Sequence, residues 1–411
     1  MERRQRRRPG NLPAEVTSFV GRTADLQAAR GLIGEARLVT LIGAGGVGKT
    51  RLAVRLGEEL GRGFPGGVWL VDLAQVAEGA DVAATVSATI ADVLDHRAAL
   101  LILDGCEPRL DDCATVVADL LHATTAVWVL TTSRQPLGVL GEHLLEVGPM
   151  ATPAPGTSVD RLRDSDAVAL FLERVSAATP SFVLTDDTAS AVVRLCRRVG
   201  GLPLALELAA IRLHALALDE LLSQLADPRQ LMRLHSRSPQ PRQRSLDASH
   251  GWSHALCSAA EQRLWARLAV FPERFDLDAA RAVCAGVDHG RTEIAESLAG
   301  LVEKSVVHRT DAGSTLSGST LSGYRSAPTA REFGELLLDD NGDREVFRQR
   351  HASHFLATAR RLVADLHSGG PAETVAAVHH DHENLATATD QLLSHGEAQS
   401  ALTPATLLCL C

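Results

Sequence analysis

A glycine-rich segment that ends in a lysine and a threonine has the residue types best suited to chemistry. Residues 43–50 read GAGGVGKT, which satisfies the pattern G-x-x-x-x-G-K-[ST]. Glycines allow a tight turn whose backbone N–H groups point inward at phosphate oxygens, and a following helix adds the positive end of its dipole. The lysine of this pattern reaches the β- and γ-phosphates, and the hydroxyl of the last residue binds Mg²⁺. The residues predicted to hold the phosphates are Gly43, Ala44, Gly45, Gly46, Val47, Gly48, Lys49 and Thr50. Lys49 is one of only two lysines among the 41 basic residues, which argues against a chance match.

A phosphate-binding loop needs an acidic partner for its metal ion, and residues 99–104 (ALLILD) supply one. This apolar run predicts a strand that delivers Asp104 at its carboxyl end, where phosphates lie in such sheets. We therefore predict that Thr50 and Asp104 bind Mg²⁺. A second apolar run, 126–131, is followed by Arg134. From its position alone, this arginine fits either a sensor of the γ-phosphate or an exposed helix cap.

The elements that must position these residues alternate between strands and helices. Apolar runs predict strands at 38–42, 68–73, 100–103, 126–131 and 144–147, and helical patterns cover 49–60, 81–96 and 110–122. Fully apolar strands that alternate with helices indicate an α/β fold, with a parallel five-stranded sheet between two helical layers.

The rest of the chain has helical patterns in several blocks. Residues 151–157 form a proline-rich break, 166–227 are helical, and the polar segment 236–244 (SRSPQPRQR) has the composition of a linker. Three helices and a strand at 305–309 then precede the low-complexity repeat 313–323, which is the outline of a winged helix whose hairpin has a mobile tip. The predicted domains are a flexible basic arm (1–15), a P-loop NTPase domain (16–150), a helical lid (158–235), a winged helix (245–340) and the truncated start of TPR-like helical repeats (345–411).

Composition excludes several classes of protein. Apolar residues make up 45% of the chain, the formal charge is −9, and no apolar run is long enough to span a membrane, so we expect a cytoplasmic globular protein. The seven cysteines never form C-x-x-C pairs, as in a protein with reduced thiols. Residues 258–310 carry seven basic and eight acidic side chains, so we do not expect direct DNA binding. His379 and Glu383 are spaced like metal ligands but lack a second cluster, and His351 and His354 are predicted at a helix surface.

The ordered set of motifs resembles the bacterial STAND ATPases, the NB-ARC-related P-loop NTPase core of large LuxR-type transcriptional regulators. The matching stretches are NLPAEVTSFVGR (11–22), LVTLIGAGGVGKT (38–50), LLILDGCE (100–107), LTTSRQPLG (130–138), GLPLALELAA (201–210), SLDASHGWSHAL (245–256), RLAVFPERF (267–275) and LVEKSVV (301–307).

The resemblance assigns further roles. Val20, Gly21 and Arg22 would lie over the adenine and ribose, Pro203 would close on the nucleotide, and Arg134 would sense the γ-phosphate. The family often has Asn after the strand aspartate, and related ATPases have a second acid there. Here that position is Gly105, which leaves Glu107 as the nearest candidate base and implies very slow or absent hydrolysis. The hairpin strand is expected to include 324–333, where Pro328 puts its pairing in doubt.

The sequence therefore predicts a switch that binds ATP or ADP with Mg²⁺ and regulates a partner in transcriptional control. Slow hydrolysis by Lys49, Asp104, Glu107 and Arg134 would separate closed and open states, with homo-oligomerisation on ATP binding and a protein partner at the C-terminal helices. Two alternatives stay open. One is a metabolic P-loop kinase or transferase with fast turnover, and the other is a truncated remnant that binds nucleotide and protein without cycling.

Overall fold

The computed structural model describes residues 9–73, 76, 80–90, 97–238, 240–286, 289–311, 322–368 and 371–409. The chain divides into two compact units. The first unit comprises residues 1–224 and 234–245, and the second comprises 225–233 and 246–411. Residues 1–8 of the predicted arm, residues 91–96 of a predicted helix and residues 313–321 of the repeat lie outside the described residues.

A five-stranded parallel sheet forms the core of the first unit, with strand order β2-β3-β4-β1-β5. The strands are β1 (Leu38–Ile42), β2 (Gly67–Asp72), β3 (Ala99–Asp104), β4 (Val127–Ser133) and β5 (Glu142–Glu146). All six residues of β3 are buried, as expected for a strand covered on both faces. The predicted α/β class and the five strands are therefore confirmed.

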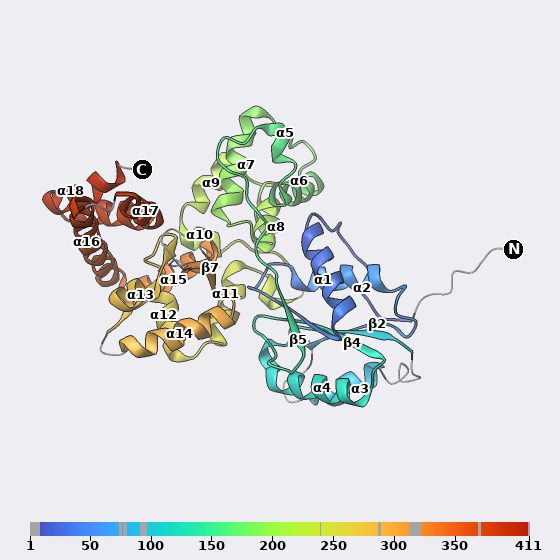
Figure 1. Ribbon diagram of the computed structural model, residues 1–411. Coiled ribbons are helices and arrows are strands. Elements are labelled where there is room, and N and C mark those ends of the chain that lie inside the picture. The colour runs from blue at the N-terminus through green and yellow to red at the C-terminus, as the bar shows by residue number, and fades with distance from the viewer. Residues whose placement is uncertain are drawn as a thin grey trace. The chain divides into compact units, whose positions relative to one another are not determined.

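Helices cover the two faces of this sheet, with α1 and α2 on one side and α3 and α4 on the other (Figure 1). Their bounds are Thr23–Glu35 (α1), Lys49–Leu60 (α2), Val82–Ile90 (α3) and Leu110–Ala123 (α4). Alternate residues of a strand face opposite sides. Leu101 and Leu103 pack in a core cluster with residues of α3 and α4. Ile102 instead points toward Gly57 of α2.

A short N-terminal segment lies along the open edge of β2. The Asn11 side chain donates to the carbonyl of Leu70 (2.8 Å) and accepts from its N–H (2.6 Å), and the Asn11 N–H donates to the Val68 carbonyl (3.3 Å). The flexible arm was predicted to extend to residue 15, but these bonds fix Asn11 on the sheet.

The rest of the first unit is helical. It contains α5 (Val159–Leu162), α6 (Asp166–Ala178), α7 (Asp186–Arg198), α8 (Pro203–Arg212) and α9 (Leu218–Leu225). Helix α7 begins with a capping box between Thr185 and Thr188, and α8 begins at Pro203, whose missing N–H costs nothing in a first turn. The prediction of an entirely helical region after the sheet is confirmed.

The second unit combines helices with a three-stranded antiparallel sheet of order β6-β8-β7. Its strands are β6 (Arg274–Phe275), β7 (Val307–Asp311) and β8 (Ser322–Ser326). Its helices are α10 (Pro228–Met232), α11 (Leu246–Ala255), α12 (Ala259–Leu268), α13 (Leu277–Cys284), α14 (Arg291–Glu303), α15 (Pro328–Asn341), α16 (Arg344–Ser368), α17 (Pro371–Ser394) and α18 (Ala398–Leu408).

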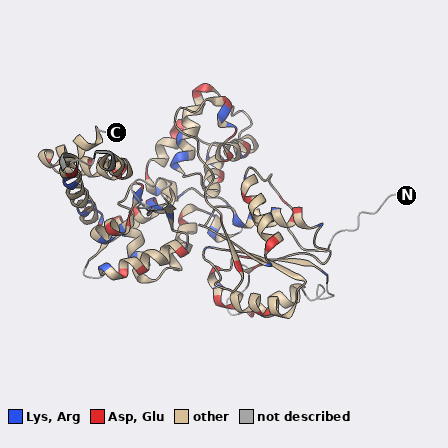
Figure 2. Ribbon diagram, in the orientation of Figure 1, with Lys and Arg blue, Asp and Glu red and all other residues tan. Residues whose placement is uncertain are grey.

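Two details of the second unit differ from expectation. The strand predicted to include 324–333 ends at Ser326, and Pro328 opens the first turn of α15, where proline fits, so β8 pairs fully with β7. Acidic and basic residues are mixed along the helices of this unit in the view of Figure 2. Among the described residues, no helix is both long and apolar enough to cross a bilayer.

Candidate functional site

The loop between β1 and α2 has the shape that its glycines predicted. Gly46 has φ of +82°, and a Cβ there would lie 2.9 Å from the Cβ of Leu204 in α8. Only glycine tolerates both the left-handed backbone and this close approach. The Lys49 ammonium donates to the carbonyls of Gly43 (2.7 Å) and Ala44 (3.0 Å), so this side chain folds over its own loop.

Lys49 is a buried ammonium whose protonation is sensitive to its surroundings. Burial lowers its pKa to about 8, although the carboxylates of Glu107 and Asp104 oppose that shift. Arg134 and Arg242 lower the pKa of Lys49 further, which shows that several charges act on this point. A phosphate brought to the loop would favour the charged ammonium and raise its pKa.

Asp104 ends β3 on the sheet face that α2 covers, because it shares the side of Ile102. Its Oδ1 atom accepts hydrogen bonds from the hydroxyls of Thr50 and Thr132, each at 2.6 Å. Burial raises the pKa of Asp104, and these two hydrogen bonds oppose the rise. Its Oδ2 atom is buried and has no hydrogen-bond partner among the described residues. The structure thus brings together the two residues predicted to bind the metal.

Glu107 and Arg134 form a buried ion pair beside Asp104. The Nε atom of Arg134 lies 3.2 Å from Oε1 of Glu107, and both side chains are at most 6% exposed. Burial raises the pKa of Glu107, but the charges of Lys49 and Arg134 outweigh it and leave the pKa below its usual value. Glu107 is therefore ionised, and its Oε2 atom has no hydrogen bond to any described residue. Arg134 is buried in the site, which removes the alternative of an exposed helix cap.

Arg22, predicted near the adenine and ribose, uses its side chain to hold the phosphate-binding loop. Its Nη2 atom donates to the carbonyls of Val47 (2.6 Å) and Gly148 (2.8 Å), and its Nη1 atom donates to Asp25 (2.6 Å). Its backbone N–H donates to Asp166 of α6 (2.8 Å). Val20 and Gly21 precede it in the chain, so this segment links the loop to the helical region.

Pro203 lies at the start of α8, next to the residue that contacts the phosphate-binding loop. The Leu204 N–H donates to the Gly46 carbonyl at 3.1 Å. This bond places the GLPL motif against the loop, as its predicted role near a nucleotide requires.

The sequence did not reveal two polar residues of this site. Thr132 bridges Asp104 and the Gly105 N–H, which donates to its hydroxyl at 2.9 Å. Its position one residue beyond the predicted strand 126–131 was the available signal. Arg242 comes from the segment predicted as a linker, and its Nη2 atom lies 3.7 Å from Oδ2 of Asp104.

These residues fit a magnesium-bound nucleotide. The two buried carboxylate oxygens without hydrogen bonds, on Asp104 and Glu107, are the hard donors that Mg²⁺ prefers. The first-turn N–H groups of α2 have no acceptor within the helix and suit an anion. The residues therefore accept both the anion and the cation of such a ligand.

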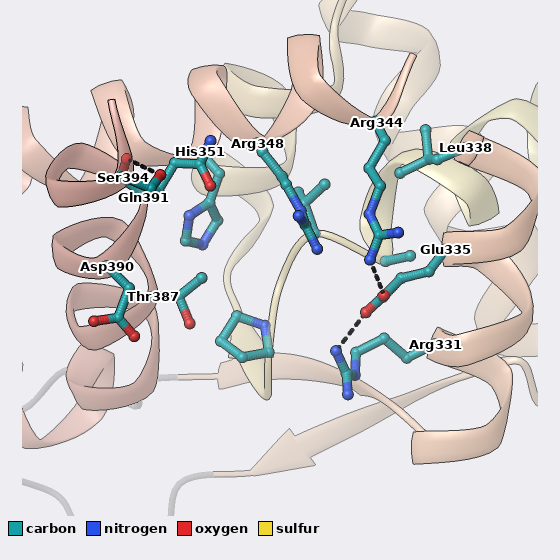
Figure 3. A pocket seen from close by; sticks show the side chains of 13 residues that line it. Arg331, Glu335, Leu338, Arg344, Arg348, His351, Thr387, Asp390, Gln391 and Ser394 are labelled. Carbon is teal, nitrogen blue, oxygen red and sulfur yellow. Dashed lines mark hydrogen bonds and ion pairs between the residues drawn. The ribbon is translucent and has the colours of Figure 1, made fainter. Parts of the chain in front are cut away.

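A separate cavity of about 420 Å³ lies within the second unit (Figure 3). Its walls carry Arg331, Glu335, Arg344, Arg348 and His351. Glu335 accepts from Arg331 at 2.7 Å and from Arg344 at 2.8 Å. Burial raises the pKa of Glu335, and the arginine charges oppose that rise. Glu335 thus pairs with two of the arginines of this cavity.

The prediction that His351 lies at a helix surface is wrong. Its side chain is buried and lies within hydrogen-bond distance of Asn384 Oδ1 (3.1 Å). Burial lowers the pKa of His351 to about 4, so the ring is neutral at physiological pH. Asn384 comes from α17, far along the chain, and local helical spacing gave no sign of this contact.

No family model matches this chain, but several curated proteins do. It is 37% identical to "Putative HTH-type transcriptional regulator Rv0890c" of Mycobacterium tuberculosis over 347 residues, which cover 81% of this chain and 37% of that protein. The chain therefore spans little more than a third of the length of that relative. It is 35% identical to "Uncharacterized protein Rv0894" of the same organism over 82% of this chain and 86% of that protein. It is also 34% identical to "Regulatory protein AfsR" of Streptomyces griseus, over 54% of this chain and 24% of that protein.

Two solved structures align only distantly. A Walker-type ATPase of Pyrococcus abyssi aligns over 79% of this chain and 99% of its own, with 12% identity and a TM-score of 0.49. A STAND protein with a tetratricopeptide repeat sensor from Pyrococcus horikoshii aligns over 95% of this chain and 55% of its own, with 14% identity and a TM-score of 0.30.

Proposed function

Because this chain belongs to the same family as the mycobacterial protein Rv0894, and because its P-loop residues lie together with Asp104, we propose that it is a nucleotide-dependent switch. In this proposal the switch is of the STAND type, binds ATP and ADP with Mg²⁺, and regulates a partner in transcriptional control. The ordered motifs from residue 11 to residue 307 support the STAND type, and the relatives that carry names of regulators support the regulatory role.

One observation carries the proposal. The Thr50 hydroxyl lies 2.6 Å from Oδ1 of Asp104, and the buried Oδ2 atom of the same carboxylate has no hydrogen bond among the described residues. A hydroxyl and a carboxylate so placed at the head of a phosphate-binding loop are the protein ligands that Mg²⁺ takes in P-loop NTPases. Bound there, the ion would neutralise charge on the β- and γ-phosphates.

The other site residues take roles that follow from their geometry. Lys49 would exchange its loop carbonyls for phosphate oxygens, and Arg134 would read the γ-phosphate. Glu107 is ionised, but its pairing with Arg134 limits its use as a base. A metabolic kinase needs a base free to act on its acceptor, so the pairing of Glu107 with Arg134 favours a switch with slow turnover.

The regulatory output is proposed to pass through protein contacts. Helix α14 carries Glu293, Glu296 and Glu303, and Lys304 beside it is paired with Glu261 at 2.8 Å. A helix that reads DNA is normally basic, so we assign no DNA contact to it. The C-terminal helices α16 to α18 are the proposed partner-binding region, with homo-oligomerisation in the ATP state.

Nucleotide analysis and sizing test the proposal most directly. We expect the purified protein to bind Mg-ADP and Mg-ATP tightly, to turn over ATP slowly, and to increase in mass by light scattering with a non-hydrolysable ATP analogue. Fast transfer of phosphate to a small acceptor would instead establish the kinase alternative. Tight binding with no change in size and no turnover would establish the non-cycling remnant.

A further inference from the structure

The segment predicted as a linker is an ordered loop whose two ends are held together. The Ser236 N–H donates to the Arg244 carbonyl at 2.7 Å, and His235 and Ser245 form an antiparallel bridge. Between these ends, Pro241–Gln243 forms a single 3₁₀ turn. A loop closed in this way presents its tip in a fixed orientation.

The tip of this loop lies against the carboxyl ends of two strands in the first unit. The Gln240 side-chain amide donates to Asp72 at the end of β2 (3.3 Å). Arg242 reaches the end of β3, where its Nη2 atom lies 3.7 Å from Oδ2 of Asp104. The loop therefore places one guanidinium group at the metal-binding end of the candidate site.

Gly105 has the conformation and the space that this arrangement needs. Its φ is +74°, and a Cβ at this position would lie 2.9 Å from Nη1 of Arg242. A side chain at residue 105 would have to displace the guanidinium group. The residue after Asp104 is thus a glycine at the point where a second arginine enters the site.

We propose that Arg242 contacts the terminal phosphate of a bound nucleoside triphosphate and makes the site prefer ATP over ADP. This inference rests on the proposed nucleotide-binding function. The ion that Thr50 and Asp104 would hold bridges the β- and γ-phosphates, so a group beside Asp104 lies on the γ-phosphate side. Arg242 is the group that neutralises Asp104 before the nucleotide arrives.

The unused donors of Arg242 support this role. A guanidinium group has five N–H donors, yet Arg242 makes no hydrogen bond to any described residue, and its distance to Asp104 is that of an ion pair only. Its side chain is 14% exposed, so these donors are free to turn toward a ligand. A phosphate would satisfy these donors in the bidentate geometry that arginine favours.

The position of the loop in the chain gives this contact a consequence. Residues 234–245 belong to the first unit, whereas residues 225–233 and the chain from 246 onward belong to the second. A movement of Arg242 between Asp104 and a phosphate would act on the two chain connections that flank this loop, at residues 233–234 and 245–246.

Calorimetry with two nucleotides tests the role of Arg242. For Arg242→Ala, we expect the affinity for Mg²⁺ with a non-hydrolysable ATP analogue to fall by about 10- to 100-fold, and the affinity for Mg-ADP to fall less than about threefold. Arg242→Lys keeps the charge without the fork and should give an intermediate loss. Arg237→Ala removes an exposed arginine from the same loop and should keep the wild-type ratio of the two affinities.

Hydrogen exchange gives a second readout that does not depend on turnover. With the ATP analogue, the amides of Gln240 and of residues 242–244 should exchange at a rate different from the nucleotide-free one in the wild type, and at the nucleotide-free rate in Arg242→Ala. If Arg242→Ala keeps the wild-type ratio of affinities while Lys49→Ala loses binding, the role of Arg242 is overturned and the nucleotide site stands. If the wild type binds neither nucleotide, both proposals fail. Should Arg242→Ala not fold, Arg242→Gln and Arg242→Lys answer the same question.

Discussion

Two regions of this molecule bury carboxylates, and the hydrogen bonds to these carboxylates differ between the regions. In the cavity of the second unit, Glu335 lies between Arg331 and Arg344, and Arg344 also pairs with Asp339 at 2.7 Å. At the end of β3, Asp104 and Glu107 each keep one buried oxygen without a hydrogen bond among the described residues.

The difference separates a structural charge cluster from a binding site. Buried polar groups are costly unless they are paired, so paired arginines and carboxylates stabilise the fold that holds them. Both oxygens of Glu335 and of Asp339 accept hydrogen bonds, whereas the ion-paired Asp104 and Glu107 each keep one buried oxygen without one, which is tolerated where a ligand completes it. A change in the cavity should therefore affect stability, and a change at the end of β3 should affect binding.

The largest expected effect is that of Lys49→Ala. Loss of the ammonium removes charge-assisted bonds to two phosphates and should lower the affinity for Mg-ATP by about 100-fold or more in calorimetry. Lys304→Ala removes the other lysine of the chain, which pairs with Glu261, and should bind ATP normally. Normal ATP affinity in Lys49→Ala would contradict the assignment of residues 43–50 as a phosphate-binding loop.

In the cavity, Glu335→Gln should lower the free energy of unfolding by roughly 2 kcal/mol, because two charge-assisted hydrogen bonds weaken. Arg348→Ala, which changes the same cavity (Figure 3), should cost less than about 0.5 kcal/mol. Chemical denaturation measures both. Neither variant should alter ATP affinity. An altered affinity would contradict the conclusion that the cavity serves stability and the end of β3 serves binding.

The pH dependence of Mg-ATP binding should follow the titration of the Lys49 ammonium. Its pKa is about 8 without ligand, and a phosphate raises it, so binding takes up a proton above pH 8. The affinity for Mg-ATP should be constant well below pH 8 and fall by up to about tenfold per pH unit above it. Calorimetry in buffers of different ionisation enthalpy measures the proton uptake. Lys49→Arg, which stays charged, should show no such fall, and a pH-independent wild type would contradict this assignment.

The smallest effect is expected for Thr132→Val. It removes one hydrogen bond to Asp104 and leaves the Gly105 N–H without its acceptor, which should weaken Mg-ATP binding about fivefold. Thr131→Val removes the neighbouring hydroxyl, which bonds Thr40 at 2.7 Å, and should lower stability by about 1 kcal/mol without changing binding. Equal affinities for the two variants would show that Thr132 serves only the fold.

The sequence predicted the sheet and much of the site because both depend on local patterns. Apolar runs defined the strands, and the spacing of Lys49, Thr50 and Asp104 placed them at one edge of the sheet. Arg242 was not predicted as a site residue because its polar, proline-containing segment has the composition of a linker. Composition does not predict which part of the fold a loop contacts. The burial of His351 was not predicted because its hydrogen-bond partner, Asn384, lies on another helix.

The N-terminal segment has a consequence for how this molecule behaves at high concentration. Strand β2 ends the sheet, and its outward backbone groups would offer a template to a strand from another molecule. The side-chain amide of Asn11 has the donor and acceptor of a peptide group and hydrogen-bonds both the carbonyl and the N–H of Leu70. These two edge groups are therefore already paired within the molecule. Asn11→Ala would keep the backbone bonds of the segment to Val68 but free the N–H and carbonyl of Leu70, and light scattering at high concentration should then detect more self-association.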